Sequence, residues 1–384
     1  MYSVLIFNGY YLPSKNYGGP LTSIINVVDS CHRDYEFYVV CKNHDFNSTV
    51  PFDVETDTWL QVGNAKVMYL SDNKIGFSKT EIGRLLDSVN PDMIWLTGIL
   101  RPQIKLVATR LAKDRHIPVL ISPRGELDRD RVRIKWYKKF PYLRLVRLVN
   151  VYGRSFFHAT SEDERKGIKR FFSPENGHIF YAPNISIAKQ PVITSHIKET
   201  GKLNVLFFSR IHPVKNLLFA FEVLSKCKSS FSFDVYGPLE DKEYWNRCMD
   251  IAKGFDSNII VQYKGVLSKD DLSRVVQEHD CLLFPTLNEN YGHVIAETLA
   301  NSRPVVISKG TTPWDIVDGV AGYAIELNQP ERFAECLDKL AEMDNLSFSA
   351  LIDSTSSFFD SCPLVSDAIE SHIDMFNKVI GSRI

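Results

Sequence analysis

The sequence predicts an α/β protein with two doubly wound parallel sheets, one in each half of the chain. Its 384 residues suggest roughly two domains. Short apolar runs, typical of buried strands, alternate with longer amphipathic stretches of helical period. Strands that alternate with helices favour parallel sheets covered on both faces. With 44% hydrophobic and 24% charged residues, the chain has the composition of a globular protein with sizeable cores.

Eleven apolar runs are predicted as buried strands, and helix-length segments separate most of them. They are residues 2–7, 36–40, 66–70, 92–96, 118–122 and 156–160 in the first half, and 204–209, 231–237, 259–265, 281–285 and 304–308 in the second. One intervening helix, over residues 268–280, has Ser268 as its expected cap and Asp271 three residues later. Residues 181–202 contain prolines and polar residues without a firm period, and we interpret this segment as a linker. The expected domains are therefore residues 1–187 and 188–365.

Cysteine usage and hydropathy exclude several classes. The seven cysteines are scattered and form no CxxC pair, so we expect neither a disulfide framework nor a zinc site, and we infer a reducing cytosol. The first twelve residues lack the features of a secretory signal and read as a buried strand. No apolar run approaches the roughly 18 residues that a membrane-spanning helix needs.

The net charge of −1 hides a split between the two halves. Residues 1–190 contain 27 Lys and Arg against 19 Asp and Glu, whereas residues 191–384 contain 18 against 27. Such asymmetry indicates a cationic half that faces an anionic surface or ligand.

The stretch SRIHPVKN, residues 209–216, follows a predicted strand directly. Arg210 and Lys215 are thus expected at the carboxyl end of a parallel strand, where open α/β sheets bind ligands. A pair of solvated surface cations is the alternative interpretation.

The stretch CLLFPTLNENYGHVIAE, residues 281–297, joins a predicted strand to a predicted helix. Gly292 permits close backbone approach, and the helix is expected to begin near His293. Its first amides have no acceptor within the helix and form an anion site. Glu289 and Glu297 supply carboxylates for hydroxyl groups. Taken alone, each glutamate is also compatible with a helix-start or surface acid.

These two motifs resemble those of the retaining glycosyltransferases of family 4. SRIHPVKN is similar to the basic motif of that family. The stretch from PTLNENYGHVIAE to PVVIS, residues 285–308, is similar to its signature of two glutamates. The resemblance implies a GT-B fold, with two Rossmann-like domains that face a deep cleft. YGGP, with Gly18 and Gly19, resembles the family's glycine loop after the first strand. The last segment, about residues 366–384, resembles the family's helix that packs back onto the first domain.

The resemblance also implies roles for the matched residues. Arg210 and Lys215 would hold the donor diphosphate, Glu297 would bind the ribose hydroxyls, and Glu289 would contact the transferred sugar. The backbone amides that would line the sugar and phosphate belong to Asn290, Tyr291, Gly292, His293 and Val294. The loop around Val266 would edge the nucleobase. The family usually has a histidine near the donor sugar, and this chain places Arg124 at that position.

The chemistry implied by the family is transfer with retention, with cations and helix amides stabilising the leaving diphosphate. GT-B enzymes typically need no bound metal, and we expect neither a metal nor another cofactor. The sole Asp-x-Asp, at residues 128–130, lies in a basic segment. We interpret it as a chance pair of solvated side chains and not as a metal site.

Residues 129–147 hold eight Lys and Arg against one acid, interleaved with aromatic and aliphatic residues. This composition suits docking on an anionic membrane surface. The alternatives are a solvated basic surface with its aromatics turned into the core, and a nucleic-acid site, which the acidic second half disfavours.

We therefore predict a retaining glycosyltransferase that moves a sugar from a UDP- or GDP-sugar to a glycan acceptor. On family grounds, we expect a lipid-linked acceptor in bacterial surface polysaccharide biosynthesis (O-antigen or capsule). The expected location is cytoplasmic, peripheral on the inner face of the membrane. The alternatives are a GT-B epimerase or phosphorylase, a non-enzymatic sugar-binding protein, and a membrane-docked protein with a dead site.

Overall fold

The structure is a computed structural model that describes residues 1–15, 17–71, 78–100, 102–127, 132–133, 136–172, 174–191 and 197–382. The chain folds into two compact units, one formed by Met1–Ile185 with Asp367–Ile384 and the other by Ser186–Ser366. The Asp-x-Asp sequence at residues 128–130 lies outside the described residues.

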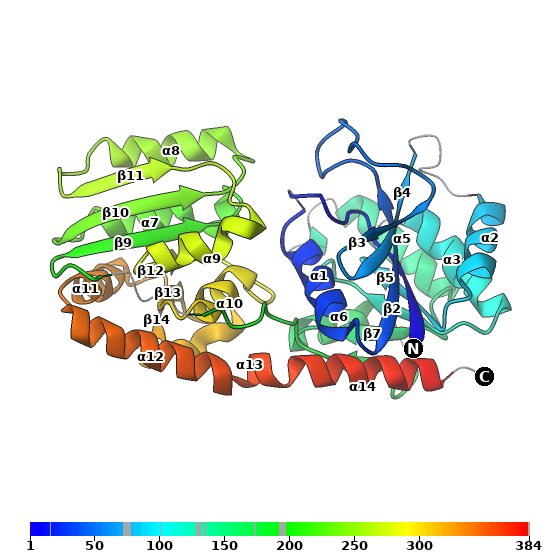
Figure 1. Ribbon diagram of the computed structural model, residues 1–384. Helices are drawn as coiled ribbons and strands as arrows, with labels where there is room; N and C mark the ends of the chain where they lie inside the picture. Colours follow the sequence, from blue (N-terminus) through cyan, green and yellow to red (C-terminus); the bar gives the residue numbers. More distant parts are fainter. Residues whose placement is uncertain are drawn as a thin grey trace. The chain divides into compact units, whose positions relative to one another are not determined.

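The described part of the first unit contains an eight-stranded sheet (Figure 1). Its strands pair in parallel except for the first two, which are antiparallel. In sheet order they are β3 (Trp59–Val62), β4 (Ala65–Leu70), β2 (Tyr35–Lys42), β1 (Tyr2–Phe7), β5 (Met93–Thr97), β6 (Val119–Ser122), β7 (Phe156–Ala159) and β8 (Ile179–Tyr181). The strand order reverses direction between β1 and β5, and ligands of open α/β sheets bind outside the carboxyl ends of strands at such a point.

Both faces of this sheet are buried, because alternate residues of β1 enter two different cores. Val4 and Ile6 join one cluster, which also contains side chains of α1 and α14. Leu5 and Phe7 join the other, with side chains of α2, α3 and α5. The helices of this unit include α1 (Gly19–Cys31), α2 (Lys79–Val89), α3 (Pro102–Asp114), α5 (Trp136–Leu148), α6 (Glu162–Phe171) and α14 (Ala368–Gly381).

The last helix, α14, belongs to the first unit although it follows the second in sequence. The ring of Phe376 lies 5.3 Å from that of Tyr35 and 5.5 Å from that of Trp95, centroid to centroid. The Tyr35 hydroxyl donates to Asn377 at 2.8 Å. Aromatic packing therefore holds this helix against the sheet.

The described part of the second unit has a six-stranded sheet in which every recorded pairing is parallel. In sheet order its strands are β11 (Ile259–Tyr263), β10 (Ser230–Tyr236), β9 (Lys202–Phe208), β12 (Cys281–Phe284), β13 (Val305–Ser308) and β14 (Gly322–Ile325). Its helices include α7 (Leu217–Leu224), α8 (Lys242–Ala252), α9 (Lys269–Glu278), α10 (His293–Ala300), α11 (Pro330–Ala341), α12 (Asn345–Ser361) and α13 (Pro363–Ser366).

The prediction of two parallel-sheet α/β domains is confirmed. The predicted cap of α9 is also present, since the Ser268 hydroxyl accepts the Asp271 amide at 3.1 Å. Three strands were not predicted, namely β3, β8 and β14, and each is only three or four residues long. Among the described residues, no helix is both long and apolar enough to cross a membrane.

Candidate active site

Arg210 and Lys215 follow β9 at the carboxyl edge of the second sheet. A short 3₁₀ helix, Pro213–Lys215, forms there with His212 as its N-cap. The His212 ring accepts a backbone amide of this turn at 3.2 Å. Asn216 then adopts the left-handed conformation, with φ of 56°. These local features fix the backbone from which Lys215 projects.

The Lys215 side chain contacts the loop that follows β12. Its ammonium group forms an ion pair with the Glu289 carboxylate, 74 residues away in sequence. The two backbones are also joined, since the Thr286 hydroxyl and the Leu287 amide both donate to the Val214 carbonyl, at 3.1 and 3.0 Å. Lys215 is only 9% exposed, so this pair is shielded from bulk water. The structure therefore brings the two predicted motifs together.

Arg210 has a different partner from Lys215. Its guanidinium donates to the Glu240 carboxylate at 2.9 Å, and Glu240 lies in the loop after β10. The loops after β9 and β10 approach closely because Gly237 has no side chain to keep them apart. A Cβ on Gly237 would lie 1.7 Å from the Ser209 carbonyl oxygen. Glu240 was not predicted as a site residue, although its place just after a strand-end glycine was a usable signal.

Helix α10 begins without a side-chain cap. Its N-cap is Gly292, whose φ of 82° lies in the left-handed region that favours glycine. The amides of Ile295 and Ala296 bond back to the Gly292 carbonyl at 2.9 and 3.1 Å. The amides that precede them belong to the helix start, which attracts anions through its dipole and its N–H groups.

The Tyr291 side chain anchors the loop before α10. It is buried, and its ring lies 5.5 Å from that of Trp314 and 5.0 Å from that of His293. The Trp314 indole donates to the Tyr291 carbonyl at 2.5 Å. The part of Tyr291 available to a ligand is therefore its backbone, which is the group that the sequence prediction used.

Glu297 lies about one turn inside α10 and is partly buried. Burial raises the pKa of its carboxyl group to about 7, and the nearby Lys269 partly offsets this effect. Lys269 starts α9, so this helix start lies within electrostatic range of Glu297. A carboxyl group with this pKa can hold or release a proton near neutral pH.

The loop after β11 completes this edge of the sheet. The Gly237 amide donates to the Gly265 carbonyl at 2.7 Å, and Gly265 has φ of 82°. The Tyr263 hydroxyl donates to the Gly237 carbonyl at 2.8 Å. Val266 is exposed, so its side chain is available to contact the edge of a ligand.

In the first unit, Gly18 and Gly19 form the start of α1. Gly18 is the N-cap, with φ of 67° and no side-chain cap, and Pro20 occupies the first turn. Arg124 lies at the carboxyl end of β6 in the same unit and is buried. Its Nη1 group donates to Asn184 at 2.7 Å, and its guanidinium carbon lies 5.4 Å from the centroid of the Trp95 ring.

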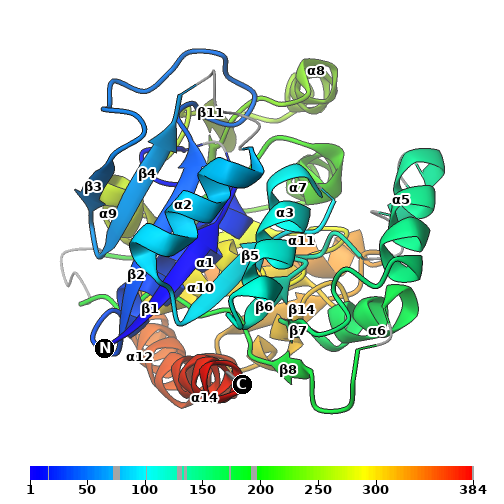
Figure 2. The same cartoon turned by 90° about the vertical axis from the view of Figure 1, so that its right-hand side faces the viewer.

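Helix α5, within the predicted basic segment, turns most of its aromatic side chains outward (Figure 2 shows it beside α6). Leu143 and Val146 are buried. Trp136 and Tyr137 are 63% and 58% exposed, and Phe140 is also exposed. The alternative that the aromatics of this segment turn into the core is therefore wrong for these three residues. Exposed large apolar side chains among cations are typical of an interaction surface.

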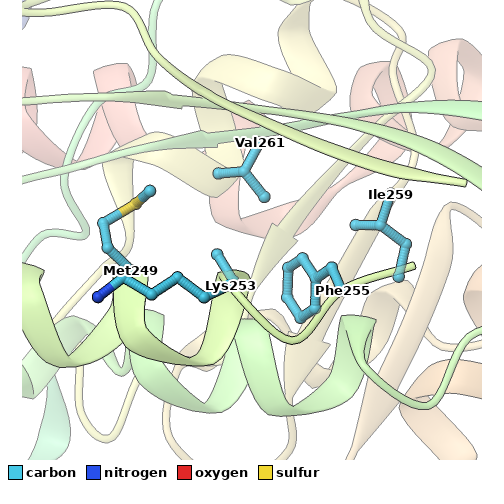
Figure 3. Close-up of a pocket in the computed structure, with 6 residues that line it drawn as sticks. Met249, Lys253, Phe255, Ile259 and Val261 are labelled. Atoms are coloured by element: carbon cyan, nitrogen blue, oxygen red, sulfur yellow. The ribbon is translucent and has the colours of Figure 1, made fainter. Parts of the chain in front are cut away.

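A small apolar hollow of about 240 Å³ lies between α8 and β11 (Figure 3). Its lining residues are Met249, Ala252, Lys253, Phe255, Ile259 and Val261. None of them is a predicted site residue. Among the described residues, no group of three or more His, Cys, Asp or Glu side chains is arranged to hold a metal ion.

Comparison with known proteins connects these features to a family. Residues 202–343 match the family described as glycosyl transferases group 1, and this segment lies wholly within the second unit. The D-inositol 3-phosphate glycosyltransferase of Corynebacterium kroppenstedtii is 30% identical over 97 residues, which are 25% of this chain and 22% of that protein. The match thus spans about a fifth of the length of this relative.

Solved structures extend the similarity to the whole chain. Anabaena HepE in complex with UDP and glucose superimposes with a TM-score of 0.68 at 13% identity, covering 98% of this chain and 100% of that chain. WaaG, a glycosyltransferase involved in lipopolysaccharide biosynthesis, superimposes with a TM-score of 0.64 at 14% identity, covering 97% and 99%. At these identities the likeness establishes the fold, which is GT-B.

Proposed function

Since residues 202–343 form a group 1 glycosyl transferase domain within a chain of GT-B fold, we propose that the protein transfers a sugar from a nucleotide sugar to a glycan acceptor. The observation that carries the proposal is the ion pair between Lys215, in the short 3₁₀ helix after β9, and Glu289. Glu289 lies in the loop that leads to the start of α10, which has no side-chain cap. Glu297 lies one turn further along the same helix. The UDP bound to the structurally similar HepE supports a nucleotide-sugar donor.

In the proposed complex, Lys215, Arg210 and the first amides of α10 bind the diphosphate. Both cations have carboxylate partners in this structure, Glu289 and Glu240. Binding of the dianionic diphosphate therefore exchanges a carboxylate for phosphate oxygens around each cation. A freed Glu289 carboxylate becomes an acceptor for hydroxyl groups of the transferred sugar. Glu297 accepts hydrogen bonds from the ribose, and Val266 edges the base.

The proposed reaction breaks the bond between the anomeric carbon and the diphosphate oxygen, and the electron pair stays with the diphosphate. The acceptor hydroxyl attacks the anomeric carbon from the same face, and its proton passes to a phosphate oxygen. The configuration of the sugar is thereby retained. The side chains of Lys215 and Arg210, with the helix amides, stabilise the negative charge that develops on the leaving group. We propose that this site works without a metal ion.

A donor screen tests this proposal directly. Purified protein is offered UDP-, GDP- and ADP-sugars, with and without EDTA, and release of nucleoside diphosphate is measured. We expect turnover of one nucleotide class, unchanged by EDTA. If turnover is lost in EDTA and restored only by Mg²⁺, the proposed metal independence is contradicted, but the proposed sugar transfer is not.

Other outcomes of the screen separate the rival functions. Interconversion of sugars on an intact nucleotide would indicate an epimerase, and turnover that requires inorganic phosphate would indicate a phosphorylase. Binding of free sugars without any nucleotide sugar would indicate a sugar-binding protein. Any of these three results overturns the proposal.

We also propose that the acceptor is lipid-linked, that the protein lies on the cytoplasmic face of the membrane, and that it acts in surface polysaccharide assembly. The exposed aromatic side chains of α5 support the membrane component. They are interleaved with cations, and Arg144 and Lys138 lie over the rings of Phe140 and Tyr137, at 5.0 and 5.8 Å from the centroids. Aromatic rings can enter the headgroup region. Cations attract anionic lipids, and each Lys or Arg near the surface contributes about 1 kcal/mol to binding.

Sedimentation with anionic liposomes tests the role of α5. Because both exposed charge and exposed rings contribute, we expect Lys138→Glu with Lys139→Glu to weaken binding about tenfold or more. The matched control reverses two exposed lysines elsewhere, Lys253→Glu and Lys378→Glu. Equal loss in the two double variants would show that the overall charge, and not α5, attracts the lipid.

A further inference from the structure

Arg124 has a hydrogen-bonding edge that the described part of the chain does not use. Its side chain is 9% exposed, and its Nη1 group donates to Asn184 at 2.7 Å. Among the described residues, no protein atom accepts a hydrogen bond from Nε or Nη2, although both atoms are buried. Burying a charged donor without an acceptor is costly, so proteins rarely retain such a group without a reason.

The two atoms form one side of the planar guanidinium group. The N–H bonds of Nε and Nη2 are parallel there, and their spacing matches two oxygens of a carboxylate or a phosphate. The rest of the group is already held, because Asn184 accepts from Nη1 and the Trp95 ring stacks on the guanidinium at 5.4 Å. The edge is therefore fixed in place for a planar, two-point contact.

Within the part of the chain that the structure describes, no carboxylate pairs with this edge. Glu164 is near enough to influence Arg124, but its own oxygens are occupied. One accepts the Gly125 amide at 2.7 Å, and the other accepts both the amide and the hydroxyl of Thr160 at 2.8 Å. An incoming anion would meet little competition from the protein.

His158 does not accept a hydrogen bond from the Nε–Nη2 edge of Arg124 either. Its Nε2 faces the Ala182 carbonyl at 2.8 Å, which places the proton on that nitrogen. Its Nδ1 therefore accepts the Ser122 hydroxyl, at 2.8 Å. Burial and the charge of Arg124 hold the pKa of His158 well below its usual range, so the ring stays neutral. Among the described residues, neither His158 nor Glu164 therefore accepts a hydrogen bond from the Nε–Nη2 edge.

The backbone that presents Arg124 is strained and braced. Its φ of 55° is uncommon for an arginine, and such conformations cluster at functional sites. The Gly125 amide is held by Glu164, and the Glu126 carboxylate accepts the amides of Ile99 and Leu100 after β5. This loop lies one strand from the reversal between β1 and β5, where α/β sheets bind ligands.

We infer that Arg124 is an anion-binding residue of the first unit, and that its Nε–Nη2 edge binds a carboxylate or phosphate group carried by a substrate. The assignment to a substrate rests on the proposed transferase function, whereas the anion site itself does not. Because both atoms are buried, an entering anion displaces the side chains that cover them.

Calorimetric titration and thermal melting of the full chain, without any nucleotide, test this inference. The probes are inorganic phosphate, glucuronate and, as the neutral control, glucose. We expect one anion to bind and to raise the melting temperature, while glucose has no effect. Arg124→Gln retains a donor for Asn184 and should bind the anion about tenfold more weakly or worse. Arg124→Lys keeps the positive charge but lacks the two parallel N–H donors of the guanidinium group, so we expect a loss of anion affinity smaller than that in Arg124→Gln.

The outcomes separate the two anions and the two sites. Binding of phosphate alone assigns a phosphate group, and binding of glucuronate alone assigns a carboxylate. Inorganic phosphate can also bind at the diphosphate site proposed around Lys215, so the titrations are repeated in Lys215→Met, where that site is weakened. The inference is overturned if Lys215→Met binds neither anion, or if its anion binding survives the addition of Arg124→Gln. A purely structural arginine would lower the melting temperature when replaced and leave anion binding unaltered. Since no sugar transfer is measured, failure of the transferase proposal gives a separate result.

Discussion

Replacing Lys215 by methionine is expected to lower kcat/KM for the nucleotide sugar on the order of 100-fold or more. The methionine keeps much of the apolar stem but removes the ammonium group that, in the proposed complex, faces the developing diphosphate charge. One charge-assisted hydrogen bond contributes roughly 1.5–3 kcal/mol, and loss of one donor to a developing oxyanion typically costs 10²–10³ in kcat. The measurement is steady-state turnover with the donor selected by the screen.

Two further variants distinguish electrostatic stabilisation from damage to the fold. Lys215→Met leaves Glu289 unpaired, so part of its effect is repulsion between this carboxylate and the phosphate. The double variant Lys215→Met with Glu289→Gln removes that repulsion and should recover some donor binding. Lys226→Ala is the matched control, because Lys226 is not among the proposed site residues and forms an exposed ion pair with Glu331 at 3.0 Å. Full turnover in Lys215→Met with an unchanged melting temperature would remove Lys215 from the site.

Replacing Glu297 by glutamine is expected to stabilise the fold at pH 8 and to weaken donor binding. An ordinary glutamate has a pKa of about 4.3, whereas burial raises the pKa of Glu297 to about 7. The folded chain therefore retains a proton that the unfolded chain has lost between these values. Its free energy of unfolding falls as the pH rises through this window.

Glutamine lacks this titration, so the variant should gain on the order of 1–3 kcal/mol relative to the parent protein at pH 8, and nothing at pH 4. Chemical denaturation at the two pH values measures the difference. A variant that is less stable at pH 8 would show that the carboxylate has a stabilising partner.

The affinity of the donor should change in the opposite sense. Ribose hydroxyls donate more strongly to a carboxylate than to a neutral carboxyl group. Donor affinity of the parent protein should therefore increase as the pH passes through about 7, and that of Glu297→Gln should be lower and flat. A nucleotide sugar suits this titration because its diphosphate is a diester without an ionisation near neutral pH. An identical pH profile in both proteins would contradict a ribose contact by Glu297.

The elements that the sequence predicted well are those specified by local patterns. The five predicted strands of the second half all lie on observed strands. β12 and β13 are continuous apolar runs that the parallel sheet buries on both sides, whereas β10 shows the alternation of a half-buried strand and β11 lies at the edge of the sheet. The cap of α9 and the start of α10 were also predicted, because a serine three residues before an acid and a glycine before an apolar period are local signals.

The contacts that sequence reasoning missed depend on long-range packing. The Arg210–Glu240 pair joins two loops whose approach requires Gly237. The strand-end glycine before Glu240 is a local signal, but the partner that Glu240 meets depends on how the two loops pack. The short strand β3 was missed because four residues give too little periodicity, and its pairing with β4 depends on the turn between them. The roles assigned to the site residues remain predictions, which the experiments above test.

By itself, the sequence determined the fold class and the order of the two motifs, because hydrophobic period and turn residues act over a few neighbours. Only the tertiary structure decided that Lys215 pairs with Glu289, that Glu297 is buried enough to titrate near neutrality, and that one edge of Arg124 has no partner among the described residues. The physical reason is that ion pairing and desolvation depend on the atoms around a group. Those atoms come from segments that are far apart in sequence and meet only when the chain has folded.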